Sequence, residues 1–254
     1  MYMALPTGSS SDGDAVEGHS YGAVILAEAD VKEVELLEVL RGIRFSGWIG
    51  PPRDGWVVVL GDPGDGVVAD GRRGVIEVAG LLAEHRERPV LAVRVRSDRQ
   101  LGIVAWRAGD EVGRYCSDPS REPGADKDVL DQPFGAELAE SLAEMFDRAD
   151  AEDQLTELLE EVLDPDSVYE SDRLRTVLRL LGLPSWIMAA GALPHDVPTG
   201  PKAAEFTRLR GGVTGISGRA IAGALGPVRR RQNPPPVIAD PPTGGGAGFE
   251  EWMF

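Results

Sequence analysis

Two aspartates in a glycine- and proline-rich loop are the first residues whose types and spacing suggest chemistry. Asp62 and Asp65 lie in the sequence GDPGDG after a short apolar run, and Asp70 follows nearby. Carboxylate oxygens are preferred ligands of Mg²⁺ and Ca²⁺, so this loop is a candidate metal site of a carboxylate- and metal-dependent hydrolase. The spacing matches no EF-hand loop, and aspartate and glycine are also common in turns. We favour the turn interpretation and keep Asp62 and Asp65 as alternative metal ligands.

The other residue types that perform catalysis occur without a recognisable arrangement. The three histidines, His19, His85 and His195, have no sequence neighbour that would complete a metal pair or a nucleophile–base dyad. Cys116 is expected to pack as a small core residue, because no neighbouring group is positioned to activate its thiol. The glycine-rich run 211–218 lacks the Gly-Lys-Ser/Thr ending of a phosphate-binding loop. The sequence therefore predicts no catalytic residue and no cofactor.

A short apolar peptide closes the sequence. Residues 249–254 read FEEWMF and follow the proline- and glycine-rich stretch 233–248, which cannot build a core of its own. Large exposed apolar side chains are unfavourably hydrated, so this peptide should contact a protein surface. That surface belongs either to the same chain or to a partner. The predicted contact residues are Phe249, Trp252, Met253 and Phe254.

A strongly acidic stretch is the second candidate interaction surface. Between Glu137 and Asp172 there are 14 acidic residues and one basic residue, Arg148, so the cations needed for pairing within helices are missing. Such a surface suits a basic protein partner, although it is also typical of a solvated helix face. Glu157, Glu160 and Glu161 are the predicted contact residues.

The composition limits the classes of partner. The 254 residues include 26 Lys and Arg against 42 Asp and Glu, which gives a net charge of −16. This balance argues against binding to nucleic acid or to an anionic membrane surface. No apolar run is long enough to span a bilayer, and the polar first 20 residues do not resemble a secretory signal. The single cysteine excludes an internal disulfide, and we expect a cytoplasmic protein.

These candidate residues must be positioned by an α+β fold. Strand patterns at 21–28, 43–49, 56–60 and 90–95 alternate with helix patterns at 31–41 and 75–87, and Asp30 is the predicted cap of the first helix. This βαββαβ order is typical of a ferredoxin-like sheet. Further strand patterns at 101–106 and 112–115 predict two added antiparallel strands. Three amphipathic helix patterns follow between 138 and 181, the last one with Ser171 as its predicted cap.

The predicted organisation has six parts. They are a flexible acidic arm (1–20), the ferredoxin-like domain (21–118), a linker (119–133), an acidic helical region (134–190), an irregular basic segment (191–231), and a Pro/Gly linker with the aromatic peptide (232–254). The favoured function is non-enzymatic: an adaptor or a bacterial immunity-like binder, whose partner is another protein with a basic or apolar groove surface. The metal-dependent hydrolase remains the alternative.

Overall fold

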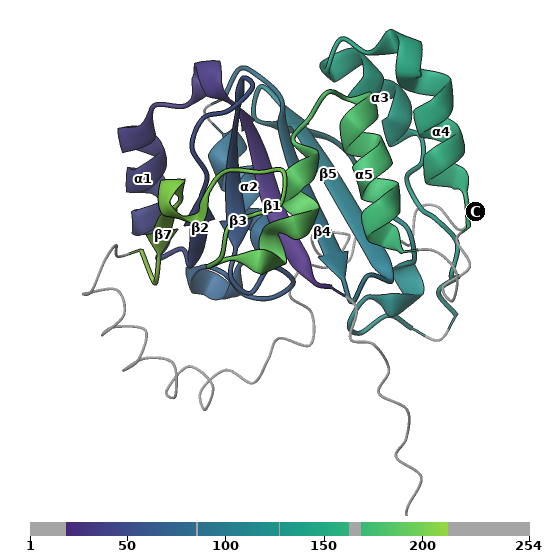
Figure 1. Ribbon diagram of the computed structural model, residues 1–254. Helices are drawn as coiled ribbons and strands as arrows, with labels where there is room; N and C mark the ends of the chain where they lie inside the picture. The colour runs from purple at the N-terminus through teal and green to yellow at the C-terminus, as the bar shows by residue number, and fades with distance from the viewer. Residues whose placement is uncertain (1–18, 85, 127, 163–168, 213–254) are drawn as a thin grey trace, which may run out of the picture.

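The structure, a computed structural model, describes residues 19–84, 86–126, 128–162 and 169–212. Seven strands form one sheet with helices on both faces (Figure 1). The strands are β1 (Tyr21–Ala27), β2 (Gly47–Ile49), β3 (Trp56–Gly61), β4 (Val90–Arg96), β5 (Gln100–Arg107), β6 (Asp110–Cys116) and β7 (Thr207–Leu209). The helices are α1 (Glu33–Gly42), α2 (Val75–Ala83), α3 (Leu138–Met145), α4 (Glu152–Glu160) and α5 (Glu170–Leu180), with 3₁₀ segments at Glu28–Asp30, Asp70–Arg72, Pro119–Arg121, Ala149–Ala151, Ser185–Ala192 and Ala203–Glu205.

The strands follow the order β6-β5-β4-β1-β3-β2-β7, and every neighbouring pair is antiparallel. Strand β1 lies at the centre and is buried along its whole length. Ile25 faces one core, whereas Val24 and Leu26 face the other, because successive strand residues point to opposite faces. Burial on both faces explains why this strand is a continuous apolar run in the sequence.

Helices complete a three-layer arrangement. Helices α1 and α2 pack on one face of the sheet through residues such as Leu40 and Leu82. Helices α3, α4 and α5, with the 3₁₀ segment Ser185–Ala192, cover the other face through Leu142, Leu155 and Leu178 (Figure 1). Each helix buries one apolar stripe, as its sequence period requires. The prediction of a mixed α+β protein is confirmed, with a seven-stranded antiparallel sheet.

Both predicted helix caps are wrong, because distant partners replace the local ones. Asp30 lies in the 3₁₀ segment before α1, and its carboxylate accepts a hydrogen bond from the backbone N–H of Arg88 at 2.7 Å. Ser171 lies inside α5, not before it. The N-terminus of α5 is instead capped by Asp98 in the β4–β5 turn, which accepts from Ser171 N–H at 2.8 Å.

Several element limits also differ from the prediction. The strand expected at 43–49 is limited to β2, and the helix expected to reach residue 87 ends at Ala83. Part of the segment predicted to be irregular, 191–231, forms β7 at the edge of the sheet. Three residues are too few to show a period in sequence, whereas the open edge of β2 offers backbone groups to pair with. No helix within the described ranges has the length and hydropathy needed to cross a membrane.

Candidate functional site

Helix α4 presents the predicted contact glutamates to solvent. Glu157 and Glu160 are exposed and three residues apart, and Glu161 follows directly as the C-terminal cap. Residues three and four apart share one side of a helix, so the three carboxylates form one acidic row. Leu155 and Leu159 lie buried in the core on the other side. The amphipathic period of α4 therefore fixes the outward direction of the glutamates.

An open hollow of about 850 Å³ lies between α4 and α5. We call it the α4–α5 groove. Its apolar lining consists of the half-buried Leu158 and Leu180. Its charged lining consists of five exposed carboxylates from the α4 segment: Glu152, Asp153, Glu157, Glu160 and Glu161. The hollow is shallow and open to solvent, and its lining combines two leucines with a larger number of polar and charged side chains.

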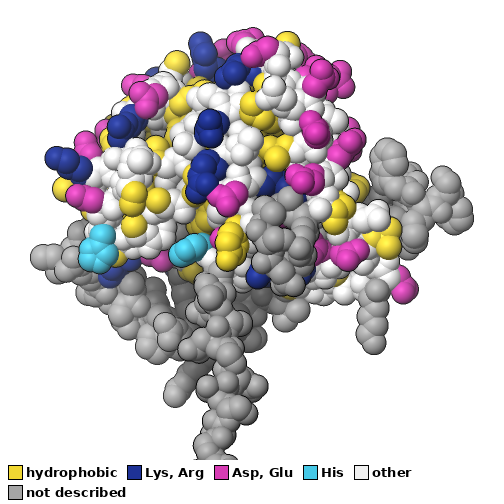
Figure 2. Space-filling view, turned by 45° about the vertical axis from the view of Figure 1, so that its right-hand side comes forward, with side chains coloured by type: hydrophobic (Ala, Val, Ile, Leu, Met, Phe, Trp, Pro, Cys, Tyr) yellow, Lys and Arg dark blue, Asp and Glu magenta, His cyan; other side chains and the backbone are white. Residues whose placement is uncertain are grey.

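The five groove carboxylates form no ion pair with any described residue. Two acidic residues near the groove do form ion pairs. Asp172 on α5 pairs with Arg175, and Asp150 pairs with Arg148 at 3.3 Å. Figure 2 shows acidic side chains gathered on the upper right of the molecule, the side on which Figure 1 places α3 and α4. Uncompensated charge of one sign raises the local concentration of oppositely charged groups and accelerates their association.

A buried arginine holds the two helices that form the groove. Arg173 on α5 is 2% exposed, and it donates hydrogen bonds to the hydroxyl of Tyr115 on β6 and to the backbone carbonyl of Glu161. Its Nε lies 3.6 Å from Oε2 of Glu170, which is also buried. Arg173 thus links α5 to the sheet and to the end of α4 that carries the acidic row.

Burial perturbs the acid beside this arginine. Loss of solvent raises the pKa of Glu170 above its ordinary value, and the positive charge of Arg173 and a hydrogen bond from Ser117 only partly oppose the rise. Nearby Asp98 and Asp118 add to it by charge repulsion. Glu170, the first residue of α5, therefore favours its neutral, protonated form more than a solvated glutamate does.

The alternative metal ligands lie at another place in the fold. Asp62 and Asp65 follow β3, and the exposed Asp62 accepts a hydrogen bond from Arg208 on β7 at 2.9 Å. The guanidinium of Arg208 also stacks 4.4 Å from the ring centroid of Trp48. Within residues 19–84, 86–126, 128–162 and 169–212, no three His, Cys, Asp or Glu side chains are grouped to hold a metal ion.

The remaining predicted residues are not brought together with the groove. Phe249, Trp252, Met253 and Phe254 lie outside the described residues, as does His85. His19 and His195 are exposed. Cys116 is buried, and loss of solvent together with the nearby Glu122 carboxylate raises the pKa of its thiol to about 12. This environment suits a core residue and not a nucleophile.

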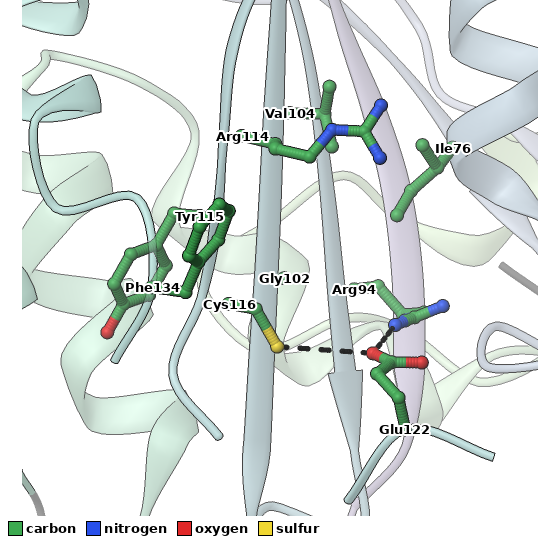
Figure 3. A pocket seen from close by; sticks show the side chains of 9 residues that line it. All are labelled: Ile76, Arg94, Gly102, Val104, Arg114, Tyr115, Cys116, Glu122 and Phe134. Atoms are coloured by element: carbon green, nitrogen blue, oxygen red, sulfur yellow. Dashed lines mark hydrogen bonds and ion pairs between the residues drawn. The ribbon is translucent and has the colours of Figure 1, made fainter. Parts of the chain in front are cut away.

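A buried ionic cluster on the α2 side of the sheet was not predicted from the sequence. Arg94 on β4 and Glu122, from the segment between β6 and α3, form an ion pair beside Cys116 (Figure 3). Arg94 and Glu122 are 2% and 7% exposed. The available signal was an arginine within the apolar strand sequence VLAVRVR, because a charge in such a strand requires a buried partner.

The chain matched no protein-family model, no curated protein and no solved structure.

Proposed function

We propose that this protein is a non-enzymatic interaction module whose α4–α5 groove binds a basic, amphipathic segment of another protein. The observation that carries the proposal is the combination of an apolar lining, Leu158 and Leu180, with five exposed carboxylates that lack cationic partners among the described residues. A helix with one apolar stripe between lysines or arginines would satisfy both parts of this lining. A purely polar cation would satisfy only the charged part.

The closing peptide 249–254 is proposed as a second docking element. The evidence for this second element comes from the sequence. Large apolar and aromatic side chains contribute much of the binding energy at protein interfaces, and the peptide contains four of them: Phe249, Trp252, Met253 and Phe254. Deletion of residues 249–254 is expected to leave the melting temperature of the protein unchanged. A lower melting temperature would indicate instead that the peptide docks on its own chain.

We also propose a ferredoxin-like fold for the first four strands and a cytoplasmic location for the protein. The order β4-β1-β3-β2, with α1 and α2 on one face, supports a ferredoxin-like classification of the first four strands. The single cysteine supports a cytoplasmic protein. The net charge of −16 supports a protein partner and argues against nucleic acid. No observation favours the metal-dependent hydrolase over this function, since Asp62 is engaged by Arg208.

The test measures binding of a synthetic 18-residue helical peptide with leucines on one face and lysines on the other. The groove variant carries Glu157→Gln, Glu160→Gln and Glu161→Gln. Each exposed charge contributes about 0.5 kcal/mol, so their loss should weaken binding about tenfold, measured by fluorescence anisotropy at low salt. A lysine peptide with serine in place of leucine should bind more weakly than the leucine peptide.

A matched variant controls for overall charge. Glu33, Glu35 and Glu38 are exposed on α1, on the other side of the sheet, and their replacement by glutamine removes the same net charge. This control is expected to change the dissociation constant less than twofold. Equal weakening by both triple variants would show that the peptide senses only net charge, and the proposed groove function would then be wrong.

A further inference from the structure

The chain carries a basic segment whose composition matches the lining of the α4–α5 groove. Residues 213–232 lie outside the described residues, and their sequence is VTGISGRAIAGALGPVRRRQ. We call them the arginine segment. This segment contains no Asp or Glu and has four arginines: Arg219, Arg229, Arg230 and Arg231. It is therefore a local concentration of positive charge in a chain whose net charge is −16.

The arginine segment also contains apolar side chains beside its charges. Ile221 and Leu225 are four positions apart, and Val228 directly precedes the cluster of three arginines. The groove presents the complementary set, with Leu158 and Leu180 as its apolar part and five exposed carboxylates as its charged part. Each component of the segment thus has a counterpart in the groove.

Other exposed acidic side chains are less suited to these arginines. Glu35 on α1 pairs with Lys32 at 2.8 Å, and Arg41 lies in the last turn of the same helix. Asp62 pairs with Arg208 at 2.9 Å. The five groove carboxylates, by contrast, form no ion pair with any residue that the structure describes. Charges without another partner attract an opposite charge most strongly, so the groove is the preferred site for the arginines.

The arginine segment is long enough to reach the groove. The last described residue, Gly212, donates its N–H to the Phe45 carbonyl at 2.8 Å, near the end of α1 and beside the edge strand β7. In the sheet order, β7 is five strands away from β5, against which α5 packs. At about 4.8 Å per strand and about 10 Å for the neighbouring helix, this path is roughly 35 Å long. The 16 residues before Arg229 span up to about 53 Å when extended, which leaves length to pass round the edge of the sheet.

We propose that the arginine segment occupies the α4–α5 groove of its own chain as an internal ligand, which the basic segment of a partner protein displaces. This inference rests on the function proposed above for the groove, and it adds regulation of the same site. A tethered ligand has an effective concentration on the order of millimolar, so a weak contact suffices to fill the groove. A partner must then bind more tightly than the tethered segment, which excludes weakly basic proteins from the groove.

The first experiment locates the arginine segment in the full-length chain. Arg229→Lys, Arg230→Lys and Arg231→Lys keep the charge and provide amines, which a carbodiimide reagent joins to carboxylates in direct contact. Mass spectrometry should find these amines joined mainly to the groove carboxylates, and the yield should fall at least about fivefold in about 0.5 M NaCl. Cross-links mainly to the exposed glutamates of α1, or equally to all exposed carboxylates, would overturn the proposal.

A mixture of ¹⁵N-labelled and unlabelled chains tests whether the contact lies within one chain. If the arginine segment binds its own chain, the cross-links should join peptides that carry the same label. Mixed-label cross-links at the groove would show that the segment docks on a second copy, and the proposed internal contact would then be wrong.

The second experiment measures displacement by the leucine–lysine peptide described above. Arg229→Gln, Arg230→Gln and Arg231→Gln should lower the dissociation constant of this peptide at least about threefold below the wild-type value, because the internal competitor is weakened. The matched control carries Arg41→Gln, Arg53→Gln and Arg72→Gln, which remove the same charge from exposed arginines of the described structure. An equal decrease in both triple variants would mean that net charge alone strengthens binding, and it would refute displacement.

These outcomes separate the internal ligand from the proposed function of the groove. If the peptide requires Glu157, Glu160 and Glu161 but binds the wild type and the Arg→Gln variant equally, the groove function stands and the internal ligand is wrong. If the peptide does not require those glutamates, the groove function is wrong. The cross-links alone then decide whether the arginine segment contacts the groove.

Discussion

Replacing Arg173 with methionine should lower the free energy of unfolding by about 3–5 kcal/mol at pH 8. Arg173 is 2% exposed, and its replacement removes the hydrogen bonds to the Tyr115 hydroxyl and the Glu161 carbonyl. Each such bond contributes about 1 kcal/mol. The larger part of the loss comes from Glu170, whose buried carboxylate would lose its positive neighbour at 3.6 Å. Methionine is similar in length and apolar, so it should leave little empty volume.

The loss should depend on pH in a defined direction. Burial already raises the pKa of Glu170, so its contribution to stability is fully present below the ordinary glutamate pKa and is lost as pH rises through the raised value. Without Arg173, the charge that opposes this rise is gone, and the pKa should rise further. Arg173→Met should therefore be less destabilising at pH 5 than at pH 8.

A double-variant cycle separates the charge from the hydrogen bonds. Glu170→Gln keeps the shape of the side chain but cannot ionise, so adding it to Arg173→Met should recover at least about 1 kcal/mol at pH 8. The pH dependence between pH 5 and 8 should be reduced by the same change. Urea unfolding of the four proteins at both pH values, followed by tryptophan fluorescence, provides the measurement. A pH-independent loss, or no recovery by Glu170→Gln, would refute the argument from buried charge.

Two further predictions concern single positions. Cys116 should react with a disulfide reagent at pH 8 about a hundredfold or more slowly in the native protein than in urea, because burial raises the pKa of its thiol to about 12; comparable rates in both states would contradict its assigned environment. Gly135→Ala should destabilise the protein by at least about 2 kcal/mol in thermal or urea unfolding, because φ is +81° there and a β-carbon would lie 1.9 Å from the Arg114 carbonyl oxygen. Gly55→Ala is the matched control, since φ is +83° but no atom lies within 4 Å; it should show a smaller loss, due to strain alone.

Local sequence patterns predicted the parts of the structure that depend on burial of one face. The helical period of Leu155 and Leu159 placed Glu157 and Glu160 on the outside of α4, because apolar residues at that spacing must face a core. The continuous apolar run at β1 predicted a buried strand for the same reason. The outward direction of the acidic row on α4 was therefore predictable from the sequence, although its position beside α5 was not.

The polar contacts were not predictable, because their partners are far apart in the chain. Asp98 caps a helix whose Ser171 is 73 positions away, and Arg94 pairs with Glu122 across 28 positions. In each case the charged residue has many acceptable partners in sequence, and the packing of the sheet against its two helical layers selects one. The same holds for the groove, since Leu180 of α5 is brought beside Leu158 of α4 only when both helices dock.

The sequence by itself thus determined the α+β class, the central buried strand, the outward direction of the glutamates on α4 and the large negative charge. Periodicity and composition are local properties, and they decide which side of an element avoids water. Only the tertiary structure decided that α5 lies beside α4 to form the groove, that Arg173 holds the two together and that Glu122 pairs with Arg94 on the opposite face. A buried charge requires a partner but does not specify which one, so this choice belongs to the folded chain as a whole.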